Sequence, residues 1–568
     1  MKLNDAIDQM VAMAPVSFDG CFGWIHTVNQ GAHKTAVVLC PGLMMDEMSG
    51  YQSMRILADA LASHGYPSLR LHYPGTGNSY DLNGGDAEYL SLWQQSINQA
   101  IDWLRERCGA ERVILCGFRF GALLATTVAA SRADVAGLVL LAPVLRGRSY
   151  VRQMMIETGQ GDGSIDASHF RLSSDTLRLI NQIELRKIPL RSTCKVGIFA
   201  QTQSGTLSEC EDTWRKAGIV VDSQDFDDLK PMLRPTFANN EPNAQVDTVV
   251  RWVCKTVPDY IYARPRDAPG RKLEDTVTTG GYVETPMFFG AEYQLFGVLC
   301  QPHLNGTHIV VIIGNQAGDP HCAGATVDLA RQLAAGGVAS LRIDFSGVGD
   351  SVAPIGSHIF ETDRGSDFTA AIDVMLELGY QKFATAGLCS GAYHAYHGAV
   401  TDPRIGFVLA INIPFFKWTP GFPVAELNFN VKRPTDFAHM MRTKTFWLKL
   451  WSKIQTGELC ISRRFVWLEQ KLRRVPWLQR GLRHLPGFEK PPIDPAELAK
   501  RVKMLFFVSE GDTSLEALNR EFGAKGPSSG ITIKLIPGLD HSMTKSNMRK
   551  IVASHIIAFI ENHFDQVQ

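Results

Sequence analysis

Leu57–Ser79, LADALASHGYPSLRLHYPGTGNS, recurs as Leu329–Ser351, LARQLAAGGVASLRIDFSGVGDS, and this repeat decides the fold. The two segments are offset by 272 residues and are identical at 11 of 23 positions. Solenoid repeats recur every 20 to 50 residues or so, and an offset this large therefore indicates a duplicated domain. The sequence predicts one module that occurs twice.

Both copies show the same order of expected elements around the repeat. An apolar run precedes it, Ala36–Cys40 in the first copy and Ile309–Ile313 in the second, and such runs are typical of buried parallel strands. An amphipathic helix, a second strand and a glycine-rich turn follow, and we interpret the turn within Asp344–Ser351 as structural. Alternating strands and helices of this kind predict an α/β fold with two doubly wound, mostly parallel sheets.

The length of the chain is consistent with two domains. A single hydrophobic core rarely extends over 568 residues, whereas two cores of roughly 270 residues are ordinary. The stretch at 263–272 is rich in Pro, Arg and Gly and is typical of a linker. We expect a first domain at residues 1–265 and a second at 276–568.

The composition excludes several classes of protein. Lys+Arg and Asp+Glu both number 57, so the net charge does not suggest a nucleic-acid partner. The first 18 residues lack the apolar core of a secretory signal, and no segment is long and apolar enough for a membrane span. The 11 cysteines form no CxxC pair, which argues against a zinc site or a disulfide framework. We expect a cytoplasmic protein without metal or cofactor, and the oligomeric state stays open.

Each copy has a G-x-x-x-G motif after a later strand. The motif reads Gly117–Gly121, GFRFG, in the first copy and Gly387–Gly391, GLCSG, in the second. Its spacing fits the sharp strand-to-helix turn that presents a nucleophile above a sheet. Arg119 cannot attack a carbonyl carbon, whereas Cys389 can, so the second copy is expected to hold the chemistry.

A candidate base and a candidate acid follow late in the second copy. The segment ITIKLIPGLDH predicts a strand and a loop that ends in His541. The apolar stretch MLFFV predicts the preceding strand, and Asp512 follows it, with Glu510 and Asp540 as alternative acids. His394 and His397 are spaced for metal ligation, but no third ligand stands out, and helix packing is the preferred interpretation.

The order of strand, glycine-rich turn, G-x-Nuc-x-G elbow, late acid and late histidine resembles the α/β-hydrolase superfamily, and the resemblance covers nearly the whole chain, twice. The resemblance implies that Cys389 is the nucleophile and that Asp512 orients His541 as its base. It also implies an oxyanion hole built from the backbone N–H groups of Ser390 and Gln316. The Ser390 hydroxyl is an alternative nucleophile, although the elbow spacing favours Cys389.

The reaction class is less sharply indicated. Dienelactone hydrolases and polyhydroxyalkanoate synthases are relatives that resemble this chain in using a G-x-C-x-G elbow, and they hydrolyse and transfer acyl groups respectively. We expect hydrolysis of an ester or thioester through a thioacyl-enzyme, with a small-molecule or carrier-bound acyl substrate. Acyl transfer to an acceptor other than water is the first alternative, and a non-catalytic binding or scaffold protein is the second.

The first copy lacks this machinery. Arg119 replaces the nucleophile, Asp228 aligns with the base position, and the segment after the acid-bearing strand offers no convincing aspartate. We therefore interpret the first domain as a pseudo-enzyme. The alternative is that Arg119, at a helix N-terminus, binds an anionic ligand in the old pocket.

The alternation of strands and helices in the second copy is interrupted at about residues 415–490, where a helical lid is expected. This segment has 15 Lys or Arg against 5 Asp or Glu, and it contains five of the ten tryptophans. Its basic face is solvated in the simplest interpretation. Two alternatives are attraction of an anionic acyl carrier or acyl-CoA and peripheral contact with an anionic membrane surface.

Overall fold

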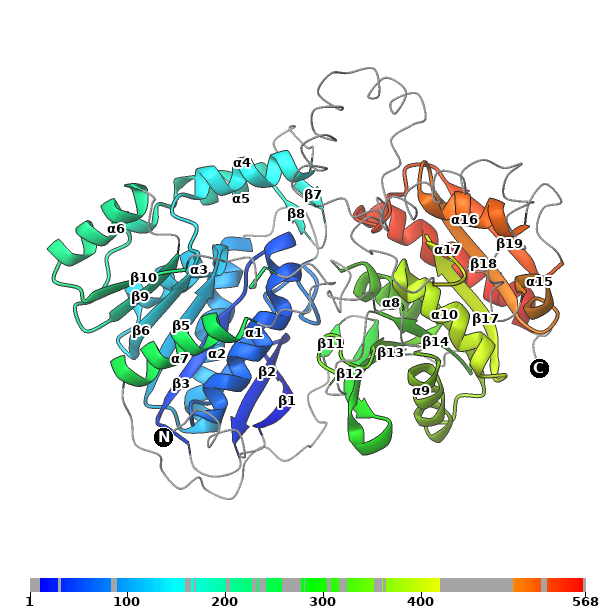
Figure 1. Cartoon of the computed structure of the whole chain (residues 1–568), viewed down its shortest axis with the longest axis horizontal. Coiled ribbons are helices and arrows are strands. Elements are labelled where there is room, and N and C mark those ends of the chain that lie inside the picture. Colours follow the sequence, from blue (N-terminus) through cyan, green and yellow to red (C-terminus); the bar gives the residue numbers. More distant parts are fainter. Residues whose placement is uncertain are drawn as a thin grey trace, which may run out of the picture.

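The computed structural model (Figure 1) describes residues 11–28, 32–82, 89–158, 165–167, 170–200, 205–226, 232–233, 242–257, 277–279, 281–303, 308–315, 324–351, 360, 364–418, 494–522 and 529–564. The expected linker at 263–272 lies outside these ranges, as does the expected lid from residue 419 onward. The domain boundaries and the lid therefore stay predictions.

The first sheet has eight strands in the order β1-β2-β4-β3-β5-β6-β9-β10. β1 and β2 run antiparallel to their neighbours, and the strands from β4 to β10 are parallel. A short hairpin, β7-β8, stands apart from this sheet. The strand bounds are β1 Val11–Phe18, β2 Cys21–Val28, β3 Thr35–Cys40, β4 Ser68–Leu71, β5 Arg112–Phe118, β6 Val135–Leu141, β7 Ile165–Ala167, β8 Phe170–Leu172, β9 Lys195–Ala200 and β10 Val221–Asp225.

The second sheet has nine strands in the order β11-β12-β13-β15-β14-β16-β17-β18-β19. Apart from β11, this order and the strand directions repeat those of the first sheet. The prediction of two tandem, doubly wound α/β domains is confirmed. The bounds are β11 Val277–Thr279, β12 Tyr282–Phe289, β13 Leu295–Pro302, β14 Ile309–Gly314, β15 Ala339–Asp344, β16 Lys382–Leu388, β17 Ile405–Ile411, β18 Lys503–Ser509 and β19 Ile531–Ile536.

Helices cover both faces of each sheet (Figure 1). In the first domain α1 and α7 share one core, and α2 and α3 share the other. In the second domain α8 and α17 lie on one side, and α9, α10 and α16 on the other. The bounds are α1 Met45–Ser63, α2 Tyr89–Cys108, α3 Phe120–Ser131, α4 Gly147–Thr158, α5 Ser174–Gln182, α6 Gly205–Lys216, α7 Asn243–Thr256, α8 Ala325–Ala335, α9 Gly365–Glu377, α10 Ser390–Thr401, α15 Pro495–Leu498, α16 Thr513–Phe522 and α17 Ser546–His563.

The apolar runs around the repeat form central strands because both of their faces are covered. In β3, Val37 and Leu39 belong to one core, and Val38 and Cys40 belong to the other. A strand buried on both sides has no need of polar alternation, which explains its continuous apolar sequence. No helix within the described ranges has both the length and the apolar character that crossing a bilayer requires.

Candidate active site

Cys389 lies at the turn between β16 and α10, near the middle of the second sheet. Its backbone has φ 53° and ψ −111°, a left-handed conformation that non-glycine residues seldom adopt. The Cys389 N–H donates to the carbonyl of Ile411 at 2.9 Å, and this bond fixes the turn against β17. Strained backbone of this kind persists where the surrounding structure determines it, and it is common at functional sites.

The two glycines of the motif let α10 approach the sheet. A Cβ atom on Gly387 would collide with the backbone of Gly391. A Cβ atom on Gly391 would collide with the carbonyl of Gly314 at the end of β14. The close packing of helix on strands therefore requires glycine at both positions.

Asp512 and His541 come together beside Cys389, from the loops after β18 and β19. His541 Nδ1 lies 2.6 Å from Asp512 Oδ2, and Cys389 lies close enough to influence the charge of the His541 ring. Burial lowers the pKa of His541, but the hydrogen bond with Asp512 and the influence of Cys389 outweigh it and raise the pKa to about 10. Burial raises the pKa of Asp512, and the bonds with His541 and Ser514 outweigh it and lower that pKa.

The two alternative acids have other surroundings. Glu510 is exposed to solvent. The Asp540 carboxylate accepts hydrogen bonds from the N–H groups of Ser542 and Thr544, at 3.0 and 3.1 Å, and from the Thr544 hydroxyl. Asp540 thus stabilises the turn that carries His541, and Asp512 is the acid that contacts the imidazole.

One of the two expected oxyanion donors lies in the described part of the chain. Ser390 is the first residue of α10 and is buried, so its N–H stands at a helix N-terminus beside Cys389. Gln316 lies outside the described residues. The preceding residue, Asn315, is buried at the end of β14, where its Nδ2 donates to Asp344 Oδ1 at 2.6 Å.

Asn412, which the sequence did not single out, connects the two loops that hold the acid and the base. It is fully buried directly after β17, with φ 50°. Its Nδ2 donates to Ser509 Oγ at 2.8 Å and to the carbonyl of His541 at 2.9 Å. Its Oδ1 accepts from the Ser509 N–H at 2.9 Å. Both loops are therefore anchored to one side chain.

The first domain has Ala142 at the equivalent position. Ala142 also follows its strand with a positive φ, 43°, and its N–H donates to Phe199 just as that of Asn412 donates to Phe507. The backbone conformation is thus shared, and the amide is present only in the copy with an acid–base pair. Comparison of the two copies at this position is the signal that could have drawn attention to Asn412, although not to its contacts.

Asn412→Ala is expected to lower kcat for an activated ester about 10- to 100-fold, because the two loops lose their shared anchor. Unfolding should become easier by about 1–3 kcal/mol, since buried partners of the amide are left unsatisfied. Steady-state kinetics and thermal unfolding measure the two effects. Ala142→Asn is the matched control and should leave kcat unchanged. An unaltered kcat in Asn412→Ala would contradict the anchoring role.

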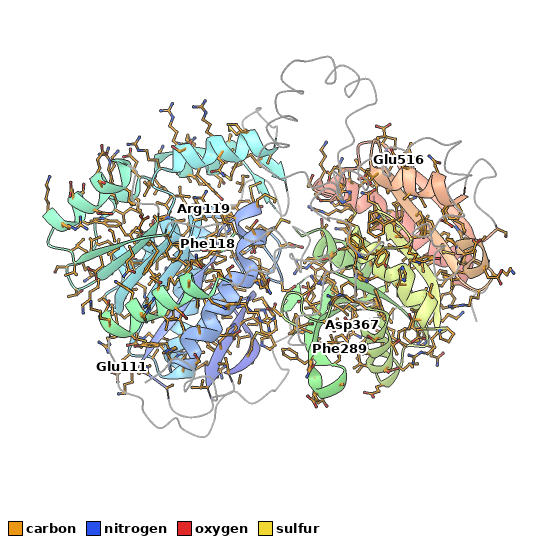
Figure 2. All side chains as sticks on the ribbon, viewed as in Figure 1. Glu111, Phe118, Arg119, Phe289, Asp367 and Glu516 are labelled. Carbon is orange, nitrogen blue, oxygen red and sulfur yellow. The ribbon has the colours of Figure 1, made fainter. Side chains whose placement is uncertain are left out.

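The elbow of the first domain has the same shape with different chemistry. Arg119 has φ 54° and ψ −115°, and Figure 2 shows it next to Phe118 at the end of β5. Its Nε donates to Asp46 Oδ2 at 3.2 Å, and a terminal nitrogen lies 3.4 Å from the carbonyl of Ala142. The guanidinium is therefore already paired with a carboxylate. Asp228 lies outside the described residues.

The helix after the second elbow packs its histidines against other groups. His397 Nε2 lies 3.0 Å from the carbonyl of Phe416. The His394 ring is buried, with the ring of Phe345 at 4.9 Å. Within the described ranges, no three His, Cys, Asp or Glu side chains gather in a way that could hold a metal ion.

Comparison with known proteins places both halves in related families. A family model described as serine aminopeptidase, S33, matches residues 31–163, and one described as alpha/beta hydrolase family matches residues 318–554. Similar solved structures include a sugar hydrolase from Lactococcus lactis (16% identity, 43% of this chain and 98% of that chain, TM-score 0.32). Another is the esterase PF2001 of Pyrococcus furiosus (15% identity, 45% and 94%, TM-score 0.32). The comparison with curated proteins gave no match.

Proposed function

The chain belongs to the α/β-hydrolase superfamily as a tandem pair of domains, and on that premise we propose that its second domain cleaves a carboxylic ester or thioester with Cys389 as the nucleophile. The observation that carries the proposal is the position of His541, which is hydrogen-bonded to Asp512 and lies close enough to Cys389 for the two side chains to interact electrostatically. A nucleophile, its base and an orienting acid form the arrangement that covalent acyl chemistry uses.

The first half of the reaction forms a thioacyl-enzyme. The proton of the Cys389 thiol passes to His541, whose raised pKa favours the imidazolium that results. The sulfur attacks the carbonyl carbon, and the resulting oxyanion faces the N–H of Ser390 at the helix N-terminus. The intermediate collapses, the bond to the leaving oxygen or sulfur breaks, and the leaving group takes the proton from His541.

The second half releases the acid and restores the site. Neutral His541 takes a proton from a water molecule, whose oxygen attacks the thioester carbonyl. The second tetrahedral intermediate expels the Cys389 sulfur, and the carboxylic acid departs. Asp512 accepts from His541 Nδ1–H throughout, which keeps the other ring nitrogen directed at the reacting atoms.

The proposal predicts a covalent intermediate on one peptide. Brief incubation with a p-nitrophenyl acyl ester, followed by acid quench and peptide mass spectrometry, should add one acyl mass to Cys389. Arg119→Ala is the control and should be labelled equally, because Arg119 is paired with Asp46 in the other domain. An acyl group on Ser390 would overturn the assignment. Absence of label and of turnover would favour the non-catalytic alternative.

The basic composition of residues 415–490 favours acyl transfer as a second candidate. With 15 Lys or Arg against 5 Asp or Glu, this segment suits an anionic carrier such as acyl-CoA. Product analysis with and without added amine or alcohol acceptors separates the two reactions. Hydrolysis yields the free acid in both cases, whereas acyl transfer yields the amide or ester of the acceptor.

A further inference from the structure

The two domains pack together through equivalent parts of their sheets. Phe22 and Trp24 on β2 form a small core with Phe296 and Val298 on β13, and the Trp24 and Phe296 rings are 4.6 Å apart. These pairs occupy matching positions, since Trp24 pairs with Arg70 on β4 and Val298 pairs with Arg342 on β15. The contact is therefore close to two-fold symmetric, as in an isologous dimer. Figure 1 shows the two domains meeting near the centre of the molecule.

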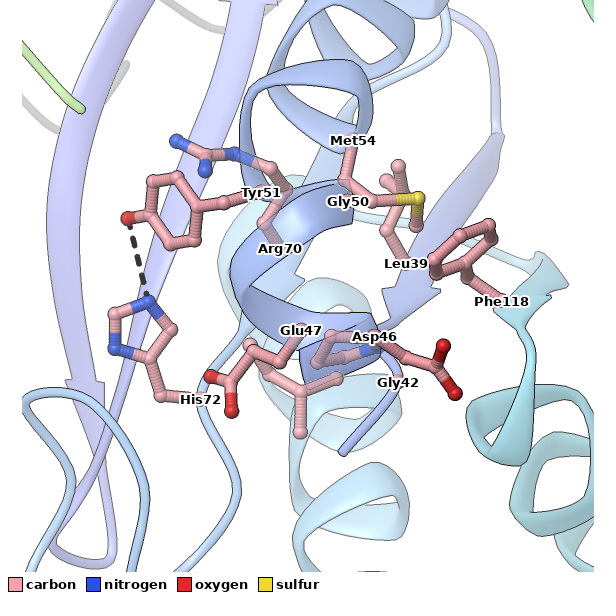
Figure 3. A pocket seen from close by; sticks show the side chains of 12 residues that line it. Leu39, Gly42, Asp46, Glu47, Gly50, Tyr51, Met54, Arg70, His72 and Phe118 are labelled. Atoms are coloured by element: carbon pink, nitrogen blue, oxygen red, sulfur yellow. Dashed lines mark hydrogen bonds between the residues drawn. The ribbon is translucent and has the colours of Figure 1, made fainter. Parts of the chain in front are cut away.

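Side chains of the first domain form hydrogen bonds with the glycine-rich turn of the second domain at residues 349–351. The Tyr51 hydroxyl of α1 donates to Asp350 Oδ2 at 2.5 Å, and Arg70 of β4 donates to Asp350 Oδ1 at 2.8 Å. Arg55 of α1 donates to the carbonyls of Gly349 and Ser351, at 2.5 and 3.1 Å. Figure 3 shows Tyr51 beside Arg70 on the first domain's side.

Asp350 is fully buried and charged in this contact. Burial raises its pKa, but Arg70 and Arg55 outweigh burial and hold the pKa below its ordinary value. Tyr51 also lies 3.4 Å from His72 Nε2, as the dashed line in Figure 3 marks. A buried carboxylate held by two side chains fixes the position of its own turn, because losing a partner leaves a charge without compensation.

Hydrogen bonds connect the glycine-rich turn to the edge of the candidate active site. The Asp350 N–H donates to Asp344 Oδ2 at 2.9 Å, and Asp344 Oδ1 accepts from Asn315 Nδ2 at 2.6 Å. Thr326 donates to Asn315 Oδ1 at 2.9 Å and completes the amide's bonding. Asn315 follows Gly314, whose carbonyl packs on the elbow at Gly391, next to Ser390.

We propose that the first domain acts as an intramolecular brace, in which Tyr51, Arg70 and Arg55 position the end of β14, and the elbow with the Ser390 N–H that packs on it, through Asp350, Asp344 and Asn315. Stabilisation of an oxyanion depends on donors that are fixed before the charge develops. A continuous set of buried hydrogen bonds from another domain provides that rigidity. This role rests on the proposed function and explains why a domain without its own nucleophile is retained in the fold.

The other half of the interface supplies a matched control. Arg331 of α8 donates to Asp81 at 2.5 Å and to the carbonyl of Ser79 at 2.9 Å, and so grips the corresponding turn of the first domain. This contact also joins the domains, yet it ends on the turn of the copy that has Arg119 at its elbow. In that turn Asn78 stands where the second domain has Asp350.

The test compares Tyr51→Phe with Asp81→Asn in the full chain. Tyr51→Phe removes one hydroxyl and keeps the ring, over which the Arg70 guanidinium lies at 5.2 Å. We expect kcat for a p-nitrophenyl ester to fall about tenfold with KM within about twofold, as for a small displacement of an oxyanion donor. Asp81→Asn should leave kcat unchanged. Asp350→Asn is the second variant, because the first domain already accommodates asparagine at this position.

A second readout isolates the oxyanion step. Alkylation by iodoacetamide joins the Cys389 sulfur to carbon with loss of iodide and forms no oxyanion, so its rate should be the same in Tyr51→Phe and in the wild type. Equal losses of kcat in Tyr51→Phe and Asp81→Asn would show that the interface only holds the two domains together, and this result would overturn the brace. So would an unchanged kcat in both Tyr51→Phe and Asp350→Asn. A wild-type chain that is never acylated at Cys389 would reject the proposed function instead.

Discussion

Cys389→Ala is expected to lower kcat/KM for an activated ester by about 10⁴-fold or more, because the sulfur that forms the covalent intermediate is gone. The fold should survive the change. Alanine also has a Cβ atom and so meets the same backbone strain as cysteine at this turn, and Ala142 has a positive φ elsewhere in the chain. Steady-state kinetics with a p-nitrophenyl ester, together with thermal unfolding, measure both expectations.

Ser390→Ala is the control that addresses the neighbouring hydroxyl. It keeps the backbone N–H at the start of α10, which is the group assigned to the oxyanion hole, and should retain activity within about tenfold. The reverse pattern, with turnover in Cys389→Ala and none in Ser390→Ala, would transfer the nucleophile to Ser390. Retention of activity in both variants would remove the elbow from the chemistry altogether.

The fold could be predicted from the sequence because the repeat supplied each element twice. The expected strand at 36–40 lies within β3, Thr35–Cys40, and the expected strand at 309–313 lies within β14, Ile309–Gly314. Continuous apolar strands, glycine-rich turns and amphipathic helices are local signals, and here local preference agrees with the global fold. The short strand β11 at the sheet edge carried no such signal, because three residues are too few for a pattern.

The candidate site could be predicted in part, because its residues follow known strand ends. Parallel strands bring their carboxyl ends to one edge, so an elbow after β16 and loops after β18 and β19 must lie near one another. The choice among Asp512, Glu510 and Asp540 needed side-chain directions. Only the structure shows that Glu510 is exposed and that Asp540 bonds within its own loop.

The supporting contacts could not be predicted, because they join positions far apart in the chain. Asn412 reaches Ser509 and His541 across about a hundred residues, and Arg70 reaches Asp350 across 280. No periodicity or motif encodes such pairs, since each depends on how complete loops and domains pack. The repeat itself suggested an inactive first copy beside an active second copy. These contacts suggest that the first copy also supports the structure of the second.

Asp512→Asn is expected to lower kcat about 10²- to 10³-fold. The carboxylate that accepts from His541 Nδ1–H is lost, and an amide can hold the ring in the wrong tautomer. The loss should be smaller than that from Cys389→Ala, because a thiolate needs less help from its base than a hydroxyl does. Glu510→Gln is the matched control, since that exposed carboxylate lies on the same loop and should change kcat by less than about twofold.

The same variant should change how stability depends on pH. His541 has a pKa raised from 6.5 to about 10, so its stabilising effect is complete below pH 6.5 and disappears as pH rises through 10. Asp512 has a lowered pKa, so its effect is complete above its ordinary value of 3.8 and disappears in acid. The free energy of unfolding of the wild type should therefore exceed that of Asp512→Asn by about 2 kcal/mol near pH 6, and by less at pH 3 and at pH 10. Denaturant titrations at the three pH values measure the difference, and a difference that is constant across them would show that the two groups do not form a charged pair.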